Sequence, residues 1–394
     1  MAAPDQKFQD TCGIHNRIVW MIIPSYFPAV GGAEVQVRLL SRALRQDGLD
    51  VRILTRRLDR RAASRTTEDG IPVIRLPGVG ITPIDSIIFL LAGLWHLFWH
   101  GRRGIYHAHA VGSAGWLAVL AGRWLGGRSL VKLRTNADVY EKIYGRGLAR
   151  WQFHRLLSWT DRLLVVNRGL ERWLLEQGHA QEKVAYFPNS IDANVFFPVS
   201  LEQKQIKREH LGLPQDKTVV LYVGRLSHVK GVDVLLEAWA ALPEDCHKIS
   251  TLIIVGDGME RPKLETMAGD SGIMKSVIFT GLSLDTRDYY QAADVFVLPS
   301  RAEGLSNALI EAMACALPCV TSSVGGSLDL VRDGDNGVLF ESENHNHLAN
   351  LLADMILGGR QLRSIGQQAR QTISETVEIA SLSKRLCKIY EELK

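Results

Sequence analysis

The chain has 394 residues, about twice the usual size of a domain, so two domains are expected. Its 46% hydrophobic and 22% charged residues are typical of globular α/β proteins and exclude the disordered and fibrous classes. The five cysteines are scattered and odd in number, which favours a reducing, cytoplasmic location over a disulfide framework. The first residues, 1–16, lack the apolar core of a signal peptide, so export is not expected.

Charge is unevenly distributed along the chain, although the formal net charge is only +4. Residues 1–200 carry 26 Lys and Arg against 16 Asp and Glu, whereas residues 201–394 carry 20 against 26. Eight of the nine tryptophans also lie in the first half. Arginine with tryptophan suits an anionic membrane surface or a phosphate-bearing acceptor, and a solvated basic face over core tryptophans is an equally good interpretation. No nucleic-acid-binding motif accompanies the charge, so a nucleic-acid partner is not expected.

Short apolar runs alternate with helix-like stretches along the first half. Residues 18–23, 51–54 and 163–166 are predicted strands, and residues 33–46 are a predicted helix. This alternation predicts a doubly wound parallel sheet. The longest apolar run, residues 87–99, is predicted to be a helix too short to cross a bilayer, which either packs on the core or docks on a membrane surface.

The same alternation resumes after a polar stretch at residues 200–210. Its buried, apolar segments predict strands at residues 218–223, 252–255, 277–280 and 295–298. A boundary is therefore expected near residue 200, between two Rossmann-like halves. The dinucleotide fingerprint is incomplete, because Arg261 stands where a third glycine should follow Gly256 and Gly258, and no phosphate loop of the Gly-Lys-Ser/Thr type is present. Dehydrogenase and P-loop functions therefore lose their main support.

Two cations follow the predicted strand at residues 218–223. Arg225 and Lys230 belong to the loop GRLSHVKG, at the carboxyl end of a parallel strand, where such sheets bind ligands. A metal-free enzyme that releases a diphosphate must neutralise it with fixed cations, and a guanidinium fork with a compact ammonium suits that task. Alone, each side chain could equally be a solvated loop cation.

Two glutamates eight residues apart follow the strand at residues 295–298. Glu303 lies in the loop and Glu311 about one turn into the next helix, with Ser306 or Asn307 as the predicted N-cap between them. A carboxylate accepts two strong hydrogen bonds, so one glutamate can hold a sugar and the other a ribose. The helix N-terminus meanwhile points its N–H groups towards a diphosphate.

These motifs, with others in the same order, resemble the retaining glycosyltransferases of family 4, the glycosyl transferases of group 1, over most of the chain. The matching segments are Gly31-Gly32-Ala33-Glu34, His107-Ala108-His109-Ala110, Phe187-Pro188-Asn189-Ser190-Ile191-Asp192, Gly224-Arg225 with Lys230-Gly231, Val255-Gly256-Asp257-Gly258, and Glu303 through Glu311-Ala312-Met313-Ala314. The resemblance implies an α/β fold of the GT-B type, with two Rossmann-like domains whose parallel sheets face an interdomain cleft. Residues 1–200 would bind the acceptor, residues 201–375 would bind the nucleotide-sugar donor, and a helix at 376–394 would cross back to the first domain.

The resemblance also implies roles for single residues. Arg225 and Lys230 would bind the diphosphate, Glu303 the sugar hydroxyls and Glu311 the ribose. In the first half, Gly31 and Gly32 would approach the donor phosphate and His109 would lie near the donor sugar, while further donor contacts are implied for Gly256, Gly258, Leu282, Ser306, Asn307 and Ala308. The expected reaction is transfer with retention from a UDP- or GDP-linked sugar to a hydroxyl, without a metal ion or other cofactor. The leaving phosphate would itself take the acceptor proton.

Three departures from the family pattern bear on the acceptor and on two turns. Arg134-Thr135-Asn136 stands where many members have His-Gly, and Ser190 and Ala316 stand where glycine is common. The expected acceptor is a glycan or lipid-linked glycan of cell-surface polysaccharide synthesis. A small natural-product acceptor, a nucleotide-sugar epimerase of the same architecture and a non-catalytic binding subunit remain as alternatives. The pair Cys315 and Cys319 is interpreted as packing, not as a metal site.

A peripheral position at the inner face of the cell membrane is also predicted, through the first half of the chain. Its basis is the apolar run at residues 87–99 and a group of six arginines: Arg52, Arg56, Arg57, Arg60, Arg61 and Arg65.

Overall fold

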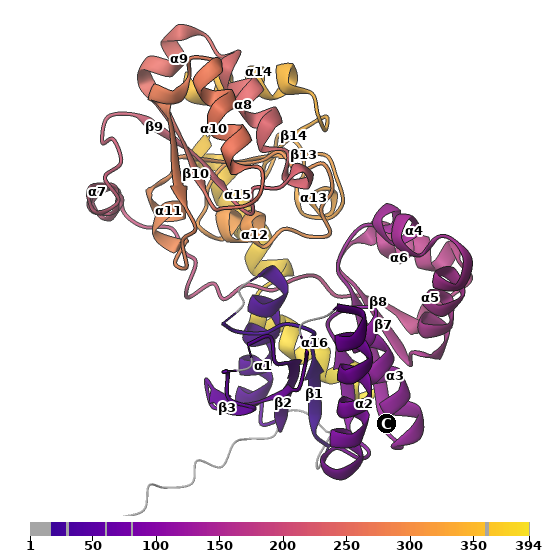
Figure 1. The fold of residues 1–394 in the computed structure, drawn as a ribbon. Coiled ribbons are helices and arrows are strands. Elements are labelled where there is room, and N and C mark those ends of the chain that lie inside the picture. Colours follow the sequence, from indigo (N-terminus) through magenta and orange to yellow (C-terminus); the bar gives the residue numbers. More distant parts are fainter. Residues whose placement is uncertain (1–16, 29–30, 60, 80–81, 359–361, 394) are drawn as a thin grey trace, which may run out of the picture. The chain divides into compact units, whose positions relative to one another are not determined.

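The computed structural model describes residues 17–28, 31–59, 61–79, 82–358 and 362–393. Its contacts divide the chain into two compact units, one formed by Met1–Ser190 with Ile379–Lys394 and the other by Ile191–Glu378. Each unit is a mainly parallel sheet covered by helices (Figure 1).

The described part of the first unit contains an eight-stranded sheet. Its strands, in order across the sheet, are β3 (Arg65–Glu68), β4 (Ile71–Leu76), β2 (Val51–Arg56), β1 (Val19–Ile22), β5 (Ile105–Ala108), β6 (Arg128–Leu133), β7 (Arg162–Val165) and β8 (Val184–Tyr186). All neighbours are parallel except β3, which pairs antiparallel with β4. The chain builds outward from β1 on one side and from β5 on the other. The topological switch point, where such sheets bind ligands, therefore lies between β1 and β5.

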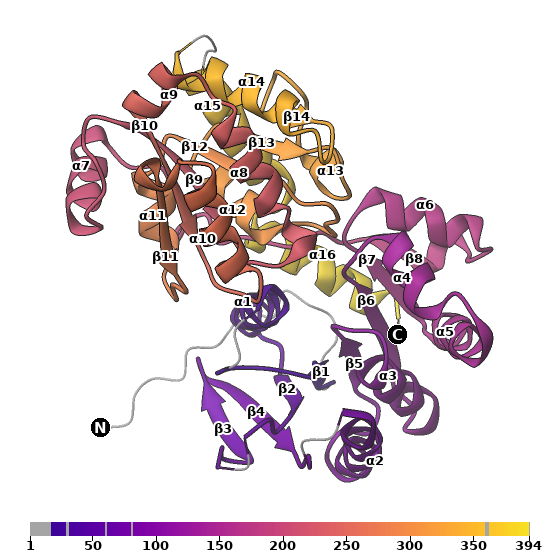
Figure 2. The ribbon, with the colours of Figure 1, turned by 45° about the horizontal axis from the view of Figure 1, so that its top comes forward.

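The helices of the first unit cover both faces of this sheet. They are α1 (Gly32–Gln46), α2 (Thr82–His100), α3 (Ser113–Trp124), α4 (Ala137–Tyr144), α5 (Gly147–Trp159), α6 (Arg168–Glu176) and α16 (Ile379–Glu391). Figure 2 shows the sheet between α1 and α2, and α1 packs against α16. Strand β1 is fully buried, which explains why its sequence VWMI is a continuous apolar run instead of an alternating one.

The described part of the second unit contains a six-stranded, wholly parallel sheet. Its order is β11 (Val277–Gly281), β10 (Ser250–Val255), β9 (Thr218–Val223), β12 (Val295–Leu298), β13 (Cys319–Ser322) and β14 (Val338–Phe340). This is the 3-2-1-4-5-6 order of a Rossmann fold, with its switch point between β9 and β12. The helices are α7 (Leu201–His210), α8 (Val232–Ala240), α9 (Glu244–Ile249), α10 (Arg261–Asp270), α11 (Arg287–Ala292), α12 (Asn307–Ala314), α13 (Ser327–Leu330), α14 (His345–Ile356) and α15 (Leu362–Thr376).

The break between the units lies at Ser190 and Ile191, not at the predicted residue 200. The polar stretch taken as the boundary is helix α7, which begins with a capping box at Ser200. Two ion pairs of 2.6 Å, Lys204–Asp294 and Lys207–Asp288, attach α7 to the second unit. At the other end, α15 continues to Thr376, so the last helix starts at Ile379 and not at residue 376.

The apolar run at residues 87–99 lies within α2 and has two apolar faces. Phe89 and Leu97 are buried, whereas Ile87, Leu91 and Trp95 are exposed by 60%, 62% and 68%. The helix therefore contributes to the core and also leaves an apolar stripe uncovered by described residues. None of the helices described is both long and apolar enough to cross a membrane.

Candidate functional site

Lys230 and Glu303 meet at the switch point of the second sheet. Lys230 follows β9 and Glu303 follows β12, and the Lys230 ammonium forms an ion pair with the Glu303 carboxylate. Ser300 Oγ donates a hydrogen bond of 3.2 Å to the same carboxylate oxygen. Both charged side chains are only partly buried, with 25% and 13% of their surfaces exposed. The sequence prediction placed these two residues on one site, and the structure brings them into direct contact.

The loops that carry this pair are fixed to each other by their backbones. The Arg301 N–H donates to Val229 O at 2.8 Å, and the Arg301 guanidinium binds both carboxylate oxygens of Asp233 at 2.8 and 2.9 Å. Gly231 has a φ of 65°, and a Cβ at this position would lie 2.0 Å from Pro299 O. Only glycine fits there, because the loop after β9 crosses directly over the loop after β12.

Arg225 lies on the same edge of the sheet and is exposed. Its carbonyl oxygen accepts a hydrogen bond of 3.2 Å from the Tyr222 hydroxyl, which holds the backbone of the loop in place. Its guanidinium has no hydrogen bond or ion pair within the described ranges. Arg225 can therefore bind an incoming anion without breaking an existing contact.

Glu311 differs from Glu303 in its surroundings. Ser306 is the N-cap of α12, since its hydroxyl accepts from the Leu309 N–H at 3.4 Å, so Asn307 and Ala308 open the helix. Glu311 follows one turn later and forms no ion pair with any described residue. Desolvation raises the pKa of Glu311 to about 7, and the nearby Tyr290 hydroxyl opposes that shift only in part.

The loops after β10 and β11 flank Arg225 on the side away from β12. Gly256 has a φ of 140°, and a Cβ there would lie 1.9 Å from Gly224 O. Gly258 approaches Leu226 O as closely, and Leu282, just after β11, is 75% exposed. These residues therefore lie at the same carboxyl end of the strands as Arg225, but on its other side from the Lys230–Glu303 pair.

His109, Gly31 and Gly32 lie at the switch point of the first sheet. Gly31 is the N-cap of α1 and Gly32 is its first residue, while His109 follows β5. His109 is 2% exposed, its Nε2 lies 3.2 Å from Met21 Sδ, and its ring stacks on His107 with centroids 4.2 Å apart. Burial lowers the pKa of His109 well below its usual value, so the ring is neutral at physiological pH.

His107 has a different task from His109. Its Nδ1 lies 2.8 Å from the Tyr390 hydroxyl, which connects β5 to α16. Burial, with a smaller contribution from Lys132, lowers the pKa of His107 to about 3. The first histidine of the motif is therefore a structural contact between the sheet and the last helix.

Sequence reasoning missed Lys132, a buried cation on β6. Its ammonium lies 3.2 Å from Asn189 Oδ1 and 5.1 Å from the centre of the Phe187 ring. Burial, and to a smaller extent Arg134, lowers the pKa of Lys132 to about 7. A lysine inside the apolar strand RSLVKL was the available signal. Together with the exposed Arg134, it places two cationic groups at the carboxyl end of β6.

The two glycine replacements have different consequences. Ser190 does not adopt a positive φ, and its N–H donates to Gln36 Oε1 at 2.7 Å while Gln36 Nε2 donates to Ser190 O at 2.8 Å. Ala316 has a φ of 58°, in the left-handed region that disfavours a Cβ. Serine is therefore accommodated by hydrogen bonding to α1, whereas alanine leaves the backbone strained.

Within the described ranges, no group of three or more His, Cys, Asp and Glu side chains could hold a metal ion. Cys315 and Cys319 are free and buried, as expected for packing residues.

Two family models match consecutive parts of the chain. The one described as "Glycosyl transferase 4-like domain" matches residues 31–190, and the one described as "Glycosyl transferases group 1" matches residues 203–372. The chain is 32% identical to a D-inositol 3-phosphate glycosyltransferase of Xylanimonas cellulosilytica, over 86% of this chain and 85% of the relative. It is 29% identical to an enzyme of the same name in Thermobispora bispora, over 92% and 90%.

Solved structures share the fold. Sucrose-phosphate synthase of Thermosynechococcus elongatus superposes with a TM-score of 0.83 at 23% identity, over 96% of this chain and 99% of that one. HepE of Anabaena in complex with UDP superposes with a TM-score of 0.78 at 19% identity, over 96% and 100%. The two parallel-sheet units have the architecture of the GT-B fold. On the similarity to its relatives along most of its length, this chain belongs to the group 1 glycosyltransferases of family 4.

Proposed function

We propose that this protein transfers a sugar from a UDP- or GDP-linked donor to an acceptor hydroxyl with retention of the anomeric configuration. The observation that carries the proposal is the Lys230–Glu303 pair at the switch point of the second sheet, with Arg225, whose guanidinium has no partner among the described residues, at the same carboxyl end of the strands. An anionic diphosphate can take Lys230 as its counter-ion, which frees the Glu303 carboxylate to accept hydrogen bonds from sugar hydroxyls.

In the proposed step, the bond between the anomeric carbon and the diphosphate oxygen breaks while the acceptor oxygen bonds to that carbon on the same face. The proton of the acceptor hydroxyl passes to the leaving diphosphate oxygen, so no protein base is required. Lys230 and Arg225 stabilise the negative charge that develops on the diphosphate, with the amides of Asn307 and Ala308 at the start of α12.

The two flanks of the edge suggest how the donor lies. The nucleoside would lie by Gly256, Gly258 and Leu282, where the exposed Leu282 side chain offers an apolar surface to the base, and its ribose hydroxyls would bind Glu311. UDP-linked sugars are the first donors to test, because HepE of Anabaena, which has this fold, was solved with UDP and with UDP-glucose. Metal independence follows from the same arrangement, in which fixed cations supply the charge that a divalent ion supplies elsewhere.

The proposed acceptor is a glycan or lipid-linked glycan of cell-surface polysaccharide synthesis. Arg134, exposed at the end of β6, favours an acceptor that carries negative charge. A second candidate is a small phosphorylated polyol, because the relatives from Xylanimonas and Thermobispora are named for D-inositol 3-phosphate. An epimerase of the same architecture would convert the donor alone and consume no acceptor.

A panel of UDP- and GDP-linked sugars, each incubated with the protein without an acceptor, tests the donor. One donor should be hydrolysed slowly, and adding a phosphorylated polyol or a glycan acceptor should accelerate its consumption. Conversion of a donor into its epimer without release of nucleotide would replace the transferase proposal with the epimerase.

The proposed peripheral membrane position rests on α2. Its exposed stripe, Ile87, Leu91, Trp95, Phe98 and Trp99, is bordered by arginine, since the Arg102 guanidinium lies 5.1 Å from the Phe98 ring. Such a surface matches the interface of an anionic bilayer, where each arginine contributes about 1 kcal/mol. The six arginines predicted from the sequence, Arg52 to Arg65, contribute less directly to this proposed membrane contact. Arg52 is paired with Asp50 at 2.7 Å, and Arg60 lies outside the described residues.

Co-sedimentation with phosphatidylglycerol vesicles at low salt tests the membrane proposal, with phosphatidylcholine vesicles as the neutral comparison. Trp95→Glu should abolish the binding, while Leu201→Glu, at a 73% exposed position on α7, should leave it intact. High salt should weaken the native interaction. No binding to anionic vesicles at low salt would remove α2 as a docking surface.

A further inference from the structure

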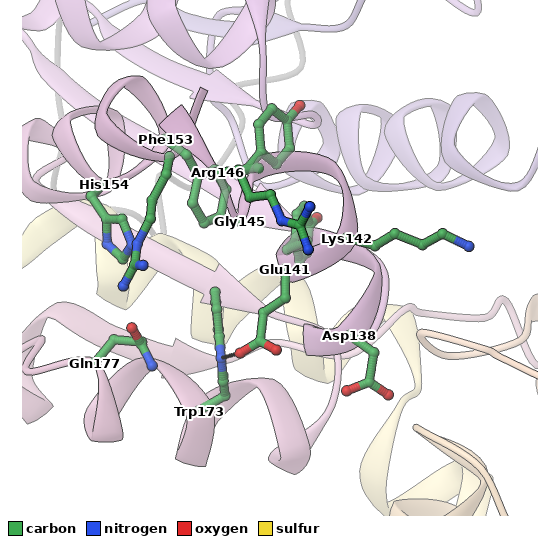
Figure 3. Close-up of a pocket in the computed structure, with 12 residues that line it drawn as sticks. Asp138, Glu141, Lys142, Gly145, Arg146, Phe153, His154, Trp173 and Gln177 are labelled. Atoms are coloured by element: carbon green, nitrogen blue, oxygen red, sulfur yellow. Dashed lines mark hydrogen bonds between the residues drawn. The ribbon is translucent and has the colours of Figure 1, made fainter. Parts of the chain in front are cut away.

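A cavity of about 720 Å³ lies within the first unit, between α4, α5 and α6, and none of the site residues considered above lines it. This volume is in the range of sites for small organic ligands. Figure 3 shows Trp173 and Gln177 on the α6 side, with Phe153 and His154 on the opposite wall.

One wall of the cavity is aromatic and tightly ordered. Tyr144 and Phe153 stack with centroids 4.7 Å apart and planes 5° apart, and Tyr140 stacks on Phe153 at 5.5 Å. On the other side, Trp173 Nε1 donates a hydrogen bond of 2.7 Å to Glu141 Oε1, which fixes the indole (Figure 3). Tyr140 and Phe153 are buried, whereas Tyr144 and Trp173 are partly exposed and offer aromatic surface on which a sugar ring can stack.

Charged groups of both signs border the same space. Lys142, Arg146 and Arg150 line it, and the side chains of all three lack hydrogen bonds and ion pairs within the part of the chain that the structure describes. Asp138 and Glu141 also line it, and Glu141 is already engaged by Trp173. Three cations against two carboxylates leave this border with a net positive charge, which fits a ligand that has both hydroxyls and an anionic group.

The cavity is connected to the edge of the first sheet through one residue. The Tyr140 hydroxyl accepts a hydrogen bond of 3.0 Å from the Arg134 N–H, while the Tyr140 ring belongs to the aromatic wall. Arg134 directly follows β6 and lies near enough to His109 to lower its pKa. The cavity therefore begins next to the residues at the carboxyl end of β5 and β6.

We infer that this cavity is a binding site for an anionic saccharide, a part of the acceptor remote from the hydroxyl that receives the sugar. The inference rests on the proposed transferase function and specifies its acceptor class. The sugar ring stacks on Trp173 and Tyr144, its hydroxyls bond to Gln177, and its phosphate or carboxylate binds Arg146 and Arg150.

Calorimetry on the full chain tests the site with two pairs of probes. The first pair is glucose 6-phosphate and glucose, and the second is a tetrasaccharide of alternating glucuronate and N-acetylglucosamine and its carboxyl-reduced, neutral counterpart. At least one anionic probe should bind about tenfold more tightly than its neutral partner, since the two differ by charge-assisted hydrogen bonds to arginine. Which pair shows the difference distinguishes a phosphate from a carboxylate.

Two variants locate the binding in the cavity. Arg150→Gln should weaken the anionic probe about tenfold. Arg172→Gln, which removes the same charge from an exposed position on α6 outside the cavity, should change it less than about twofold. Trp173→Leu, which removes the stacking surface, should weaken both the anionic probe and its neutral partner.

Equal affinity for the anionic and neutral probes would overturn the inference, as would equal effects of Arg150→Gln and Arg172→Gln. Inorganic phosphate that binds as tightly as glucose 6-phosphate would overturn the saccharide part. Donor hydrolysis without acceptor is measured separately. A protein that hydrolyses its donor but binds none of the four probes refutes the cavity and leaves the transferase function standing.

Discussion

Glu311 provides a pH-dependent signature of donor binding. Its pKa of about 7 means that, at pH 6, about 90% of the molecules carry a protonated Glu311, whereas at pH 8 about 10% do. If the ribose hydroxyls bind to the ionised carboxylate, binding must release that proton. The donor should therefore release about 0.9 proton at pH 6 and about 0.1 at pH 8.

The same equilibrium fixes the pH dependence of affinity. Because only the ionised form binds, the apparent affinity is proportional to the ionised fraction of Glu311, so donor affinity should rise about tenfold from pH 6 to pH 8. The raised pKa of Glu311 also makes the stability of the protein depend on pH, because a carboxyl whose pKa is higher in the folded state binds its proton more tightly when the protein is folded. The stabilising effect of this proton is fully present below pH 4.5 and is lost as the pH rises to about 7, by roughly 3 kcal/mol in all.

Calorimetry with UDP-glucose at pH 6 and pH 8, in buffers of different ionisation enthalpy, measures the released protons directly. UDP-glucose is preferable to UDP because its diphosphate does not titrate in this range. Glu311→Gln should bind more weakly and show neither proton release nor a pH trend. If the native protein releases no proton at pH 6, or the Glu311→Gln variant releases as many, the assignment of Glu311 to the ribose is wrong.

Three further predictions follow from the second unit. Lys230→Ala should lower kcat/KM by about 10²–10³, equivalent to 2.7–4 kcal/mol. Lys217→Ala, which changes a residue at the opposite, amino-terminal end of β9, should alter kcat/KM little. Equal losses in the two variants would contradict a contact between Lys230 and the diphosphate. Transfer should survive excess EDTA, and a complete loss that only Mg²⁺ or Mn²⁺ restores would contradict the metal-free mechanism. Ala316→Gly should raise the free energy of unfolding in urea by about 0.5–1 kcal/mol, because the relief of left-handed strain exceeds the added entropy of the unfolded chain; a less stable variant would refute that strain.

The sequence was sufficient to predict the most apolar strands, though not β3, β4, β13 or β14, and it predicted the charged residues that follow β9 and β12. Buried parallel strands need apolar runs, and such runs at residues 218–223 and 295–298 directly precede Lys230 and Glu303. Two such strands placed side by side bring the loops after them together, which is why residues 73 positions apart could be assigned to one site. The N-cap was predicted as Ser306 or Asn307, and Ser306 is observed.

Features set by tertiary contacts were not predictable in this way. The polar composition of residues 200–210 suggested a domain boundary near residue 200, but these residues form helix α7, which ion pairs to Asp288 and Asp294 attach to the second unit. The pKa of Glu311 depends on burial, which the spacing of the two glutamates does not reveal. The same holds for Lys132, since only the fold brings Asn189 and Phe187 to its ammonium.

The stereochemistry of transfer tests the central claim most directly. Proton NMR can follow the anomeric signal of the first-formed product, with the donor that the panel identifies and an accepted hydroxyl compound. An α-linked donor should yield an α-linked product in the native protein, and Glu303→Gln should suppress product formation while sugar-free nucleoside diphosphate still binds. A β-linked first product would contradict the proposed retention, and a Glu303→Gln variant that transfers as fast as the native protein would contradict the proposed role of the Lys230–Glu303 pair.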